Sequence, residues 1–232
     1  MILVIYRLLN VYKSRYNKFK EVGKVNMENK DQKTMTNREI NAIETRNVLY
    51  TTALSLFSSK GFENVKIIDI TNAAGFSKGS FYTYFKSKEY VLVEFFRRID
   101  DYYDEAYKNI TTDTPASEQL LTIINAMTVF CTNNCGVNAL SIIYSHQITS
   151  HSLDSKVLSD KNRHFFNILH KIVRHGKSTG EFRKDINDDD MITLIERSCH
   201  GLLYDWCLYN GLFDLVEAGQ NYFKKVLVMI SA

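Results

Sequence analysis

The sequence contains very little proline and glycine. Proline occurs once, at Pro115, and glycine only ten times among 232 residues. Both residues interrupt regular backbone, so their scarcity favours long helices over short strands joined by frequent turns. No stretch shows the sustained alternation of apolar and polar residues that is typical of a half-buried strand. We therefore predict an all-α chain.

Cysteine is also scarce, and its spacing excludes two kinds of small protein. The four cysteines form no C-x-x-C pair of the zinc-binding type, and they are too few for a secreted disulfide scaffold. We expect buried free thiols in a reducing cytoplasm. Cys131 and Cys135 lie one helical turn apart, so a redox pair remains an alternative. The histidines lack the i,i+4 spacing of two ligands on one helix face, and we expect no metal.

The sequence also lacks a large excess of either positive or negative charge. The chain has 29 Lys and Arg against 26 Asp and Glu, and beyond residue 34 the balance is close to even. A non-specific DNA-coating protein would be strongly basic throughout. The sequence also has no nucleophile elbow, phosphate loop or paired carboxylates at a working spacing, so we predict no enzyme and no cofactor.

The first residues, MILVIYRLLNVY, form the most apolar run near the start. A signal peptide carries its basic residues before such a run, whereas here they follow it, and the run is too short to span a bilayer. We interpret 1–42 as a poorly ordered extension or linker, with Met27 or Met35 as the working start. A basic arm that contacts phosphates and a membrane-surface helix are the alternatives. We expect no membrane partner and a cytoplasmic protein.

Helical periodicity divides the rest of the chain into two parts. In the first, 43–103, apolar residues recur every three or four positions from Ile43. Shorter helices should follow at 67–74 and 78–85, the second capped by Ser77, then a long one over 90–109. In the second part, 104–232, we predict helices near 117–133, 138–150, 155–178, 188–210 and 213–230. We expect 43–103 to be a DNA-binding domain and 104–232 an effector-binding and dimerisation domain.

The segment 66–85 has the pattern of a DNA-binding helix-turn-helix. Ala73 and Ala74 are small enough for a second helix to cross closely, and Gly75 permits a sharp turn. Phe76 and Phe81 should fill the space between the two helices. The second helix then presents short hydroxyls and a cation at its N-terminal end, the end that enters the major groove.

An ordinary helical hairpin is the alternative for this segment. Phe81 and Phe85 would then belong to the core, with Tyr82 and Tyr84 half-buried. The hairpin requires the small-small-Gly turn and the polar outer face to coincide by accident, so we favour DNA binding. Hydroxyls and backbone N–H groups suit phosphates, and Lys78 suits a phosphate or a guanine edge.

The motifs ETR at 44–46, GF at 61–62 and AAGFSKGSFYTYFKSKE at 73–89 resemble the N-terminal domain of TetR/AcrR-family transcriptional regulators. The resemblance covers about 43–103. It implies a homodimer that binds a palindromic operator and is released by a small-molecule effector in its C-terminal domain. The residues that it places at the DNA are Lys66, Ser77, Lys78, Gly79, Ser80, Tyr82, Thr83, Tyr84 and Lys88. The family usually has a capping Thr where this chain has Lys66, and lysine cannot cap.

Two further sets of residues are predicted for the C-terminal region. The effector should be hydrophobic or amphipathic, and its candidate pocket residues are Tyr103, Tyr107, Met127, Phe130, Tyr144, Phe166, His170 and Trp206. The last two helices carry more apolar surface than one helix pair can bury, which favours a four-helix interface between two copies. The candidate interface residues are Leu202, Trp206, Phe213, Tyr222, Phe223 and Val226. A repressor is the favoured function, and an activator or a ligand-independent regulator of the same fold is the alternative.

Overall fold

The computed structural model describes residues 36–149 and 157–232, and the regular structure in these ranges is helical apart from one isolated bridge between Phe182 and Ser231. The all-α prediction is confirmed. The three interpretations of the first residues, with Met27 and Met35, fall outside the described residues. The helices are α2 (Asn37–Lys60), α3 (Ile67–Ala74), α4 (Lys78–Tyr84), α5 (Lys88–Lys108), α6 (Ala116–Phe130), the π-helical turn η1 (Cys131–Cys135), α7 (Gly136–Thr149), α8 (His164–Thr179), α9 (Asp188–Leu208) and α10 (Leu215–Ile230).

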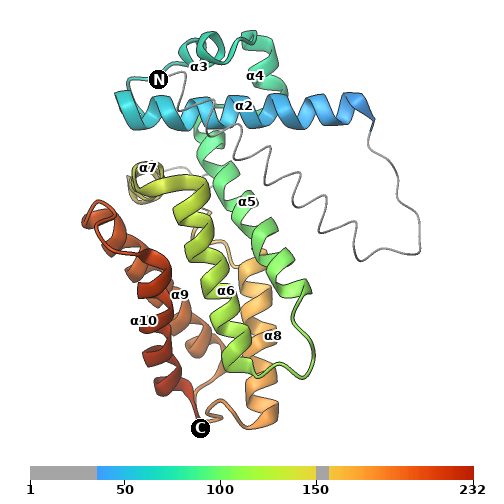
Figure 1. The fold of residues 1–232 in the computed structure, drawn as a ribbon, viewed down its shortest axis with the longest axis vertical. Helices are drawn as coiled ribbons and strands as arrows, with labels where there is room; N and C mark the ends of the chain where they lie inside the picture. Colours follow the sequence, from blue (N-terminus) through green and yellow to red (C-terminus); the bar gives the residue numbers. More distant parts are fainter. Residues whose placement is uncertain (1–35, 150–156) are drawn as a thin grey trace.

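The helices form a small unit at one end of a larger bundle (Figure 1). Helix α2 lies across this end, and α3 and α4 cover its outer side. Helix α5 starts beside them and runs down into the bundle, where it packs on α6 and α8. Helices α9 and α10 close the bundle against α6, α7 and α8. Helix α5 is therefore the element that the two parts share.

Helix α2 begins six residues before the predicted start at Ile43. Thr36 and Glu39 form a capping box, in which the Thr36 hydroxyl accepts from the Glu39 N–H and the Glu39 carboxylate accepts from the Thr36 N–H at 2.8 Å. Such a box satisfies N–H groups that the first turn leaves without partners. Capping therefore starts the helix before its apolar periodicity begins, and the first turn stays exposed.

The predicted helix over 155–178 is wrong at its start. Helix α8 begins at His164, and residues 157–163 form turns. In these turns the Asp160 carboxylate accepts from the backbone N–H of Asn162 at 2.9 Å, an Asx turn that competes with helix formation. The change places Arg163 at the entrance of α8, in extended backbone conformation.

The stretch Ala116–Thr149 is long and apolar enough to cross a membrane by length and composition alone. In the fold it is a core element, because Leu120, Ile123 and Ile124 are fully buried where α6 packs on α5, α8 and α10. It is also interrupted. After η1 the chain changes direction at Gly136, whose φ of +74° favours glycine. The two separate helices predicted here correspond to α6 and α7.

Candidate DNA-binding helix and effector cavity

Helix α4 is held on α3 by a glycine turn and two buried rings. Gly75 ends α3 in the left-handed conformation, with φ 76° and ψ 28°. Phe81 is fully buried and Phe85 nearly so, and their ring centroids lie 5.5 Å apart. Phe76 is partly buried against the same core. Ala73 is exposed and does not pack as predicted, whereas its neighbour Ala74 is partly buried against the core.

The outer face of α4 is polar and locally ordered. Ser77 caps the helix by accepting from the Ser80 N–H at 3.1 Å, and the Ser77 and Ser80 hydroxyls lie 2.9 Å apart. The Thr83 hydroxyl donates to the Gly79 carbonyl at 3.2 Å. These bonds fix the rotamers of the three hydroxyl side chains while the helix face itself stays exposed.

The larger side chains of α4 divide into exposed and half-buried ones. Lys78 is exposed, and its ammonium lies 6.0 Å from the centroid of the Tyr82 ring, which is itself half exposed. Tyr84 is partly buried and packs against the core. Lys78 and Tyr82 are therefore the long polar side chains that α4 presents outward, and Tyr84 contributes at most its edge.

The two flanking lysines lie in different environments. Lys66 precedes α3 with its side chain exposed. Its backbone N–H donates to the Asp69 carboxylate at 2.8 Å, which supplies only one half of a capping box, since a lysine side chain has no acceptor. The Lys88 ammonium donates to the Phe62 carbonyl at 2.9 Å and lies 4.3 Å from the Phe62 ring. Lys88 therefore connects α5 to the loop after α2, and its side chain is 20% exposed.

Residues 49–95 match the family described as "Bacterial regulatory proteins, tetR family". The matched stretch extends from α2 to α5 and contains the whole turn and α4. The chain is a TetR-family transcriptional regulator. The predicted family is thereby confirmed, and so is a DNA-binding regulator rather than an enzyme.

Relatives of the chain extend this match into the C-terminal region. It is 26% identical to the HTH-type transcriptional repressor KstR2 of Mycolicibacterium smegmatis, over 78% of this chain and 88% of the relative. It is 21% identical to the fatty acid metabolism regulator protein of Bacillus subtilis, over 73% and 87%. The solved structure of the regulator FadR from Bacillus subtilis, in complex with stearoyl-CoA, covers 79% of this chain and 98% of its own with a TM-score of 0.68 at 19% identity. This last likeness shows a shared fold.

The C-terminal part of this TetR-family chain encloses a cavity of about 30 Å³. Of the eight predicted pocket residues, Tyr103, Met127, Tyr144 and Phe166 line it. The other four do not line the cavity, because three of them contact other residues of the bundle. Phe130 packs edge-on against the Phe95 ring and at a tilt against the Tyr102 ring. Tyr107 lies beside Lys171, Trp206 donates to the Phe213 carbonyl, and His170 does not line the cavity.

Two polar side chains at this cavity, those of Arg163 and His200, were not predicted. Arg163 lines it and is paired with Asp100, and His200 lines it beside Tyr144, with ring centroids 6.3 Å apart. Burial lowers the pKa of His200, so its imidazole is neutral at pH 7. Burial also holds the pKa of Tyr103 and Tyr144 well above the usual range, so both keep their protons.

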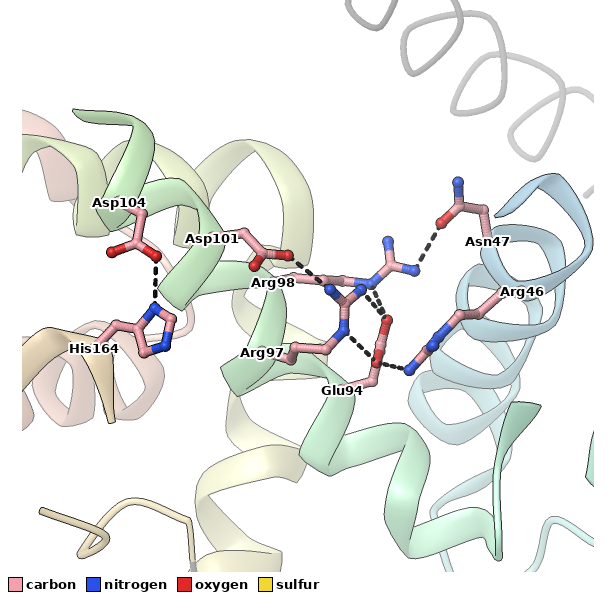
Figure 2. A network of polar contacts seen from close by, with 8 residues as sticks. All are labelled: Arg46, Asn47, Glu94, Arg97, Arg98, Asp101, Asp104 and His164. Atoms are coloured by element: carbon pink, nitrogen blue, oxygen red, sulfur yellow. Dashed lines mark hydrogen bonds and ion pairs between the residues drawn. The ribbon is translucent and has the colours of Figure 1, made fainter. Parts of the chain in front are cut away.

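A buried carboxylate joins the DNA-binding part to α5 (Figure 2). The Glu94 side chain is 2% exposed and accepts from Arg46 of α2 at 2.6 Å and from Arg97 and Arg98 of its own helix at 2.7 and 3.0 Å. Arg98 also donates to Asn47 of α2 at 2.7 Å. Burial by itself raises the pKa of Glu94, but these arginines more than offset it and the pKa lies below its usual value.

The four cysteines are free thiols. Burial is the largest influence on each, and it raises the pKa of Cys131, Cys135, Cys199 and Cys207. Thiols with a raised pKa are poor nucleophiles and are oxidised slowly. The redox alternative for Cys131 and Cys135 therefore gains no support, and no cluster suited to a metal ion occurs among the described residues.

Helices α9 and α10 and their connection expose several large apolar side chains. A groove of about 500 Å³ runs between them, lined by Leu212, Phe213 and Tyr222 among others. Of the predicted interface residues, Trp206, Phe223 and Val226 are buried within the chain, whereas Leu202 lines the groove with Phe213 and Tyr222. The large apolar side chains that are exposed on these helices and their connection are Tyr204, Leu208, Tyr209, Leu212, Tyr222, Val228 and Met229.

Proposed function

We propose that this TetR-family regulator is a repressor that binds a palindromic operator through α4 and leaves it when a small hydrophobic or amphipathic molecule binds the C-terminal bundle. The observation that carries the proposal is the exposed polar face of α4, supported from below by Gly75 and Phe81. Lys78, Tyr82 and Thr83 are its leading contacts to DNA, with the backbone of Gly79. Lys66 is a candidate phosphate contact. Regulation of this kind takes place in the cytoplasm, beside the chromosome.

The effector site is proposed at the cavity bounded by α5 to α9. At about 30 Å³ the cavity holds about one water molecule, whereas small-molecule pockets measure roughly 300 Å³ or more. The structure is thus in a closed form, and an effector has to separate the helices to enter. A relative of the same fold binds stearoyl-CoA, which supports a ligand with a long apolar part.

The operator-bound form is proposed to be a homodimer, with the exposed apolar surface of α9 and α10 buried against a second copy. Leu208, Leu212 and Val228 are 60%, 85% and 78% exposed, which is unusual for aliphatic side chains on neighbouring elements of one monomer. We also propose the division into 43–103 and 104–232. Its boundary lies within α5, so the two domains share that helix.

A mobility-shift titration with the DNA upstream of the chain's own gene tests the DNA contact. We expect the full chain to shift this duplex in excess unrelated competitor, and Lys78→Ala and Tyr82→Phe each to weaken the affinity by about tenfold, the effect of one lost charged or polar contact. Lys184→Ala is the control, since this exposed lysine lies in the loop after α8. If both α4 variants bind as the wild type does, α4 is not the DNA-binding helix.

The wild-type chain and Lys78→Ala also distinguish a repressor from an activator. A promoter fused to a reporter should be silenced by the wild-type chain and released by Lys78→Ala. Increased expression with the wild type would show an activator of the same fold. Light scattering at micromolar concentration should give the mass of two chains, and Leu212→Asp should give one. A monomeric wild type would refute the dimer.

A further inference from the structure

The cavity contains a charged group that its apolar surroundings do not explain. Arg163 is 9% exposed and lines a cavity whose other walls include Phe95, Phe96 and Met127. Its guanidinium lies 4.9 Å from the centroid of the Phe96 ring. A buried arginine is costly unless an anion accompanies it, and here that anion is the carboxylate of Asp100, on α5.

The pairing leaves part of the guanidinium unused. Asp100 accepts from Nε at 3.1 Å and from Nη2 at 2.8 Å, the two-point geometry that arginine offers to any carboxylate. A guanidinium has five N–H donors, and the Arg163 side chain makes no other hydrogen bond among the described residues. The side chain therefore has donors to spare for a second anion at the cavity wall.

A second group at the cavity lacks a partner. The hydroxyl of Tyr144, in α7, is buried and has no hydrogen-bond partner within the described part of the chain. A buried hydroxyl without a partner costs free energy, and such groups mark places where a ligand or water completes the bonding. Tyr144 and Arg163 line the same cavity and are both donors, so they suit one acceptor group between them.

We infer that the effector cavity takes an amphipathic carboxylate, whose head group is bound by Arg163 and the Tyr144 hydroxyl and whose hydrocarbon chain fills the space between the aromatic walls. This inference rests on the proposed function only in placing the effector in the C-terminal bundle. It adds the charge of the ligand and the residues that recognise it.

Repulsion between two carboxylates at Arg163 links ligand binding to the DNA-binding part. A ligand carboxylate on the spare donors of Arg163 lies beside the carboxylate of Asp100 and repels it, which weakens the Arg163–Asp100 pair. Asp100 is 13% exposed and turns toward water, so the part of α5 that carries it moves outward. Because α5 is joined to α2 through Glu94 and Arg46, this movement respaces α4 and lowers DNA affinity.

Calorimetric titration of the full chain with dodecanoate, dodecanol and dodecanoyl-CoA tests the inference. The three probes share one alkyl chain and differ at the head group. We expect the wild type to bind dodecanoate about tenfold more tightly than dodecanol, as for a charge-assisted contact. In Arg163→Met the two affinities should become equal within about twofold. Arg183→Met is the control, because Arg183 forms an exposed two-point pair with Asp185 away from the cavity and should leave the preference unchanged.

Tyr144→Phe keeps the inference testable if Arg163→Met does not fold. Removing a hydroxyl that has no partner should not lower the unfolding temperature, yet dodecanoate affinity should fall by about threefold to tenfold. A folded Arg163→Met that retains the preference for dodecanoate overturns the inference. So does an unchanged Tyr144→Phe, a wild type that binds no dodecanoate, or tighter binding of dodecanoyl-CoA that is indifferent to Arg163. Failure of the wild type to bind DNA would refute the proposed function and leave these ligand results standing.

Discussion

In the N-terminal half of α5 the buried carboxylate of Glu94 receives three guanidinium groups, whereas in the C-terminal half Asp100 receives one, from Arg163. Both acids lie on one helix and both join it to another part of the molecule. Glu94 joins α5 to α2 through Arg46, and Asp100 joins it to the entrance of α8. His164, the next residue of α8, adds an exposed pair with Asp104 (Figure 2).

This difference indicates which end of α5 loses its contacts when the conformation changes. A carboxylate shared by three cations keeps its position when any one of them is displaced, and a network of this kind is worth more than its separate pairs. A carboxylate with a single partner has no such reserve. We therefore expect α2, α3, α4 and the first half of α5 to move as one unit, and the contact of α5 with α8 to be the one that changes.

The largest expected effect comes from Glu94→Gln. The amide removes the carboxylate that Arg46, Arg97 and Arg98 share, although Arg97 keeps its pair with Asp101. Breaking a buried pair costs about 3–5 kcal/mol. We expect about 3 kcal/mol, since Arg46 and Arg97 side chains are 37% and 50% exposed and are partly solvated. Urea denaturation at pH 7 measures it. Glu105→Gln, which breaks only an exposed pair with Lys108, should cost less than about 1 kcal/mol.

Acid should remove the difference between the wild type and Glu94→Gln. The pKa of Glu94 is lowered in the folded state, so its contribution is complete above the ordinary value of 4.5 and is lost as the pH falls through the lowered pKa. The two free energies of unfolding should therefore converge when the titration is repeated toward pH 3. A gap that is independent of pH would mean that Glu94 acts by shape and not by charge.

The next largest effect should come from Gly176→Ala, within the body of α8. A Cβ at this position lies 2.4 Å from Cδ2 of Phe182, a ring that is fully buried. Overpacking costs about 1–3 kcal/mol, and the better helix propensity of alanine returns up to about 1 kcal/mol. We expect a net loss of about 1–2 kcal/mol in urea denaturation with DNA affinity unchanged. Gly201→Ala, where an added Cβ meets nothing within 4 Å, should not destabilise the chain.

Ser77→Ala perturbs the DNA-binding unit alone. It removes the cap from the Ser80 N–H, a change that costs about 1 kcal/mol in typical helices. Because α4 is short, losing the cap should destabilise this helix and leave the C-terminal bundle largely unaffected. We therefore expect weaker DNA binding in a mobility shift and little change in the unfolding of the C-terminal bundle. Ser77→Asp should preserve the cap and the fold. Equal loss of stability in both variants would show that the cap is unimportant.

The smallest effect is expected for His164→Ala. The hydrogen bond that the His164 imidazole donates to the Asp104 carboxylate raises the pKa of His164. The pair therefore stabilises the fold fully below the ordinary value of 6.5 and loses its effect as the pH rises through the raised pKa. The imidazole is exposed, and pairs of this kind contribute little. Thermal unfolding at pH 6 should show a small difference from the wild type that disappears at pH 9. A difference that grows with pH would contradict the assigned role.

The DNA-binding unit was predictable because its determinants are contiguous. Gly75, Phe76 and Phe81 lie within seven positions, and local rules place the turn and the buried rings. The hydrogen bond of Lys88 was not predictable, because its acceptor, the Phe62 carbonyl, lies 26 positions earlier in the sequence. The exposure of Ala73 was not predictable either, because the Ala73-Ala74-Gly75 sequence alone does not show which alanine faces the core.

The cavity was predicted only in part, for a related reason. Aromatic and apolar periodicity identified Tyr103 and Met127, which lie on long helices. Arg163 pairs with a residue 63 positions away and lies at the end of a turn that the sequence suggested was helical. A pair of opposite charges so far apart leaves no periodic pattern. The burial of Trp206 and Phe223 likewise depends on tertiary packing, of α9 on α7, α8 and α10 and of α10 on α6.

The most direct test of the proposed coupling is the affinity of the full chain for its upstream duplex, measured by fluorescence anisotropy with and without dodecanoate. The account predicts that saturating dodecanoate weakens DNA binding by at least about fivefold and that DNA weakens dodecanoate binding by the same factor, as linkage requires. It also predicts that Arg163→Met binds the duplex but no longer responds. Equal DNA affinity with and without dodecanoate in the wild type would contradict the account.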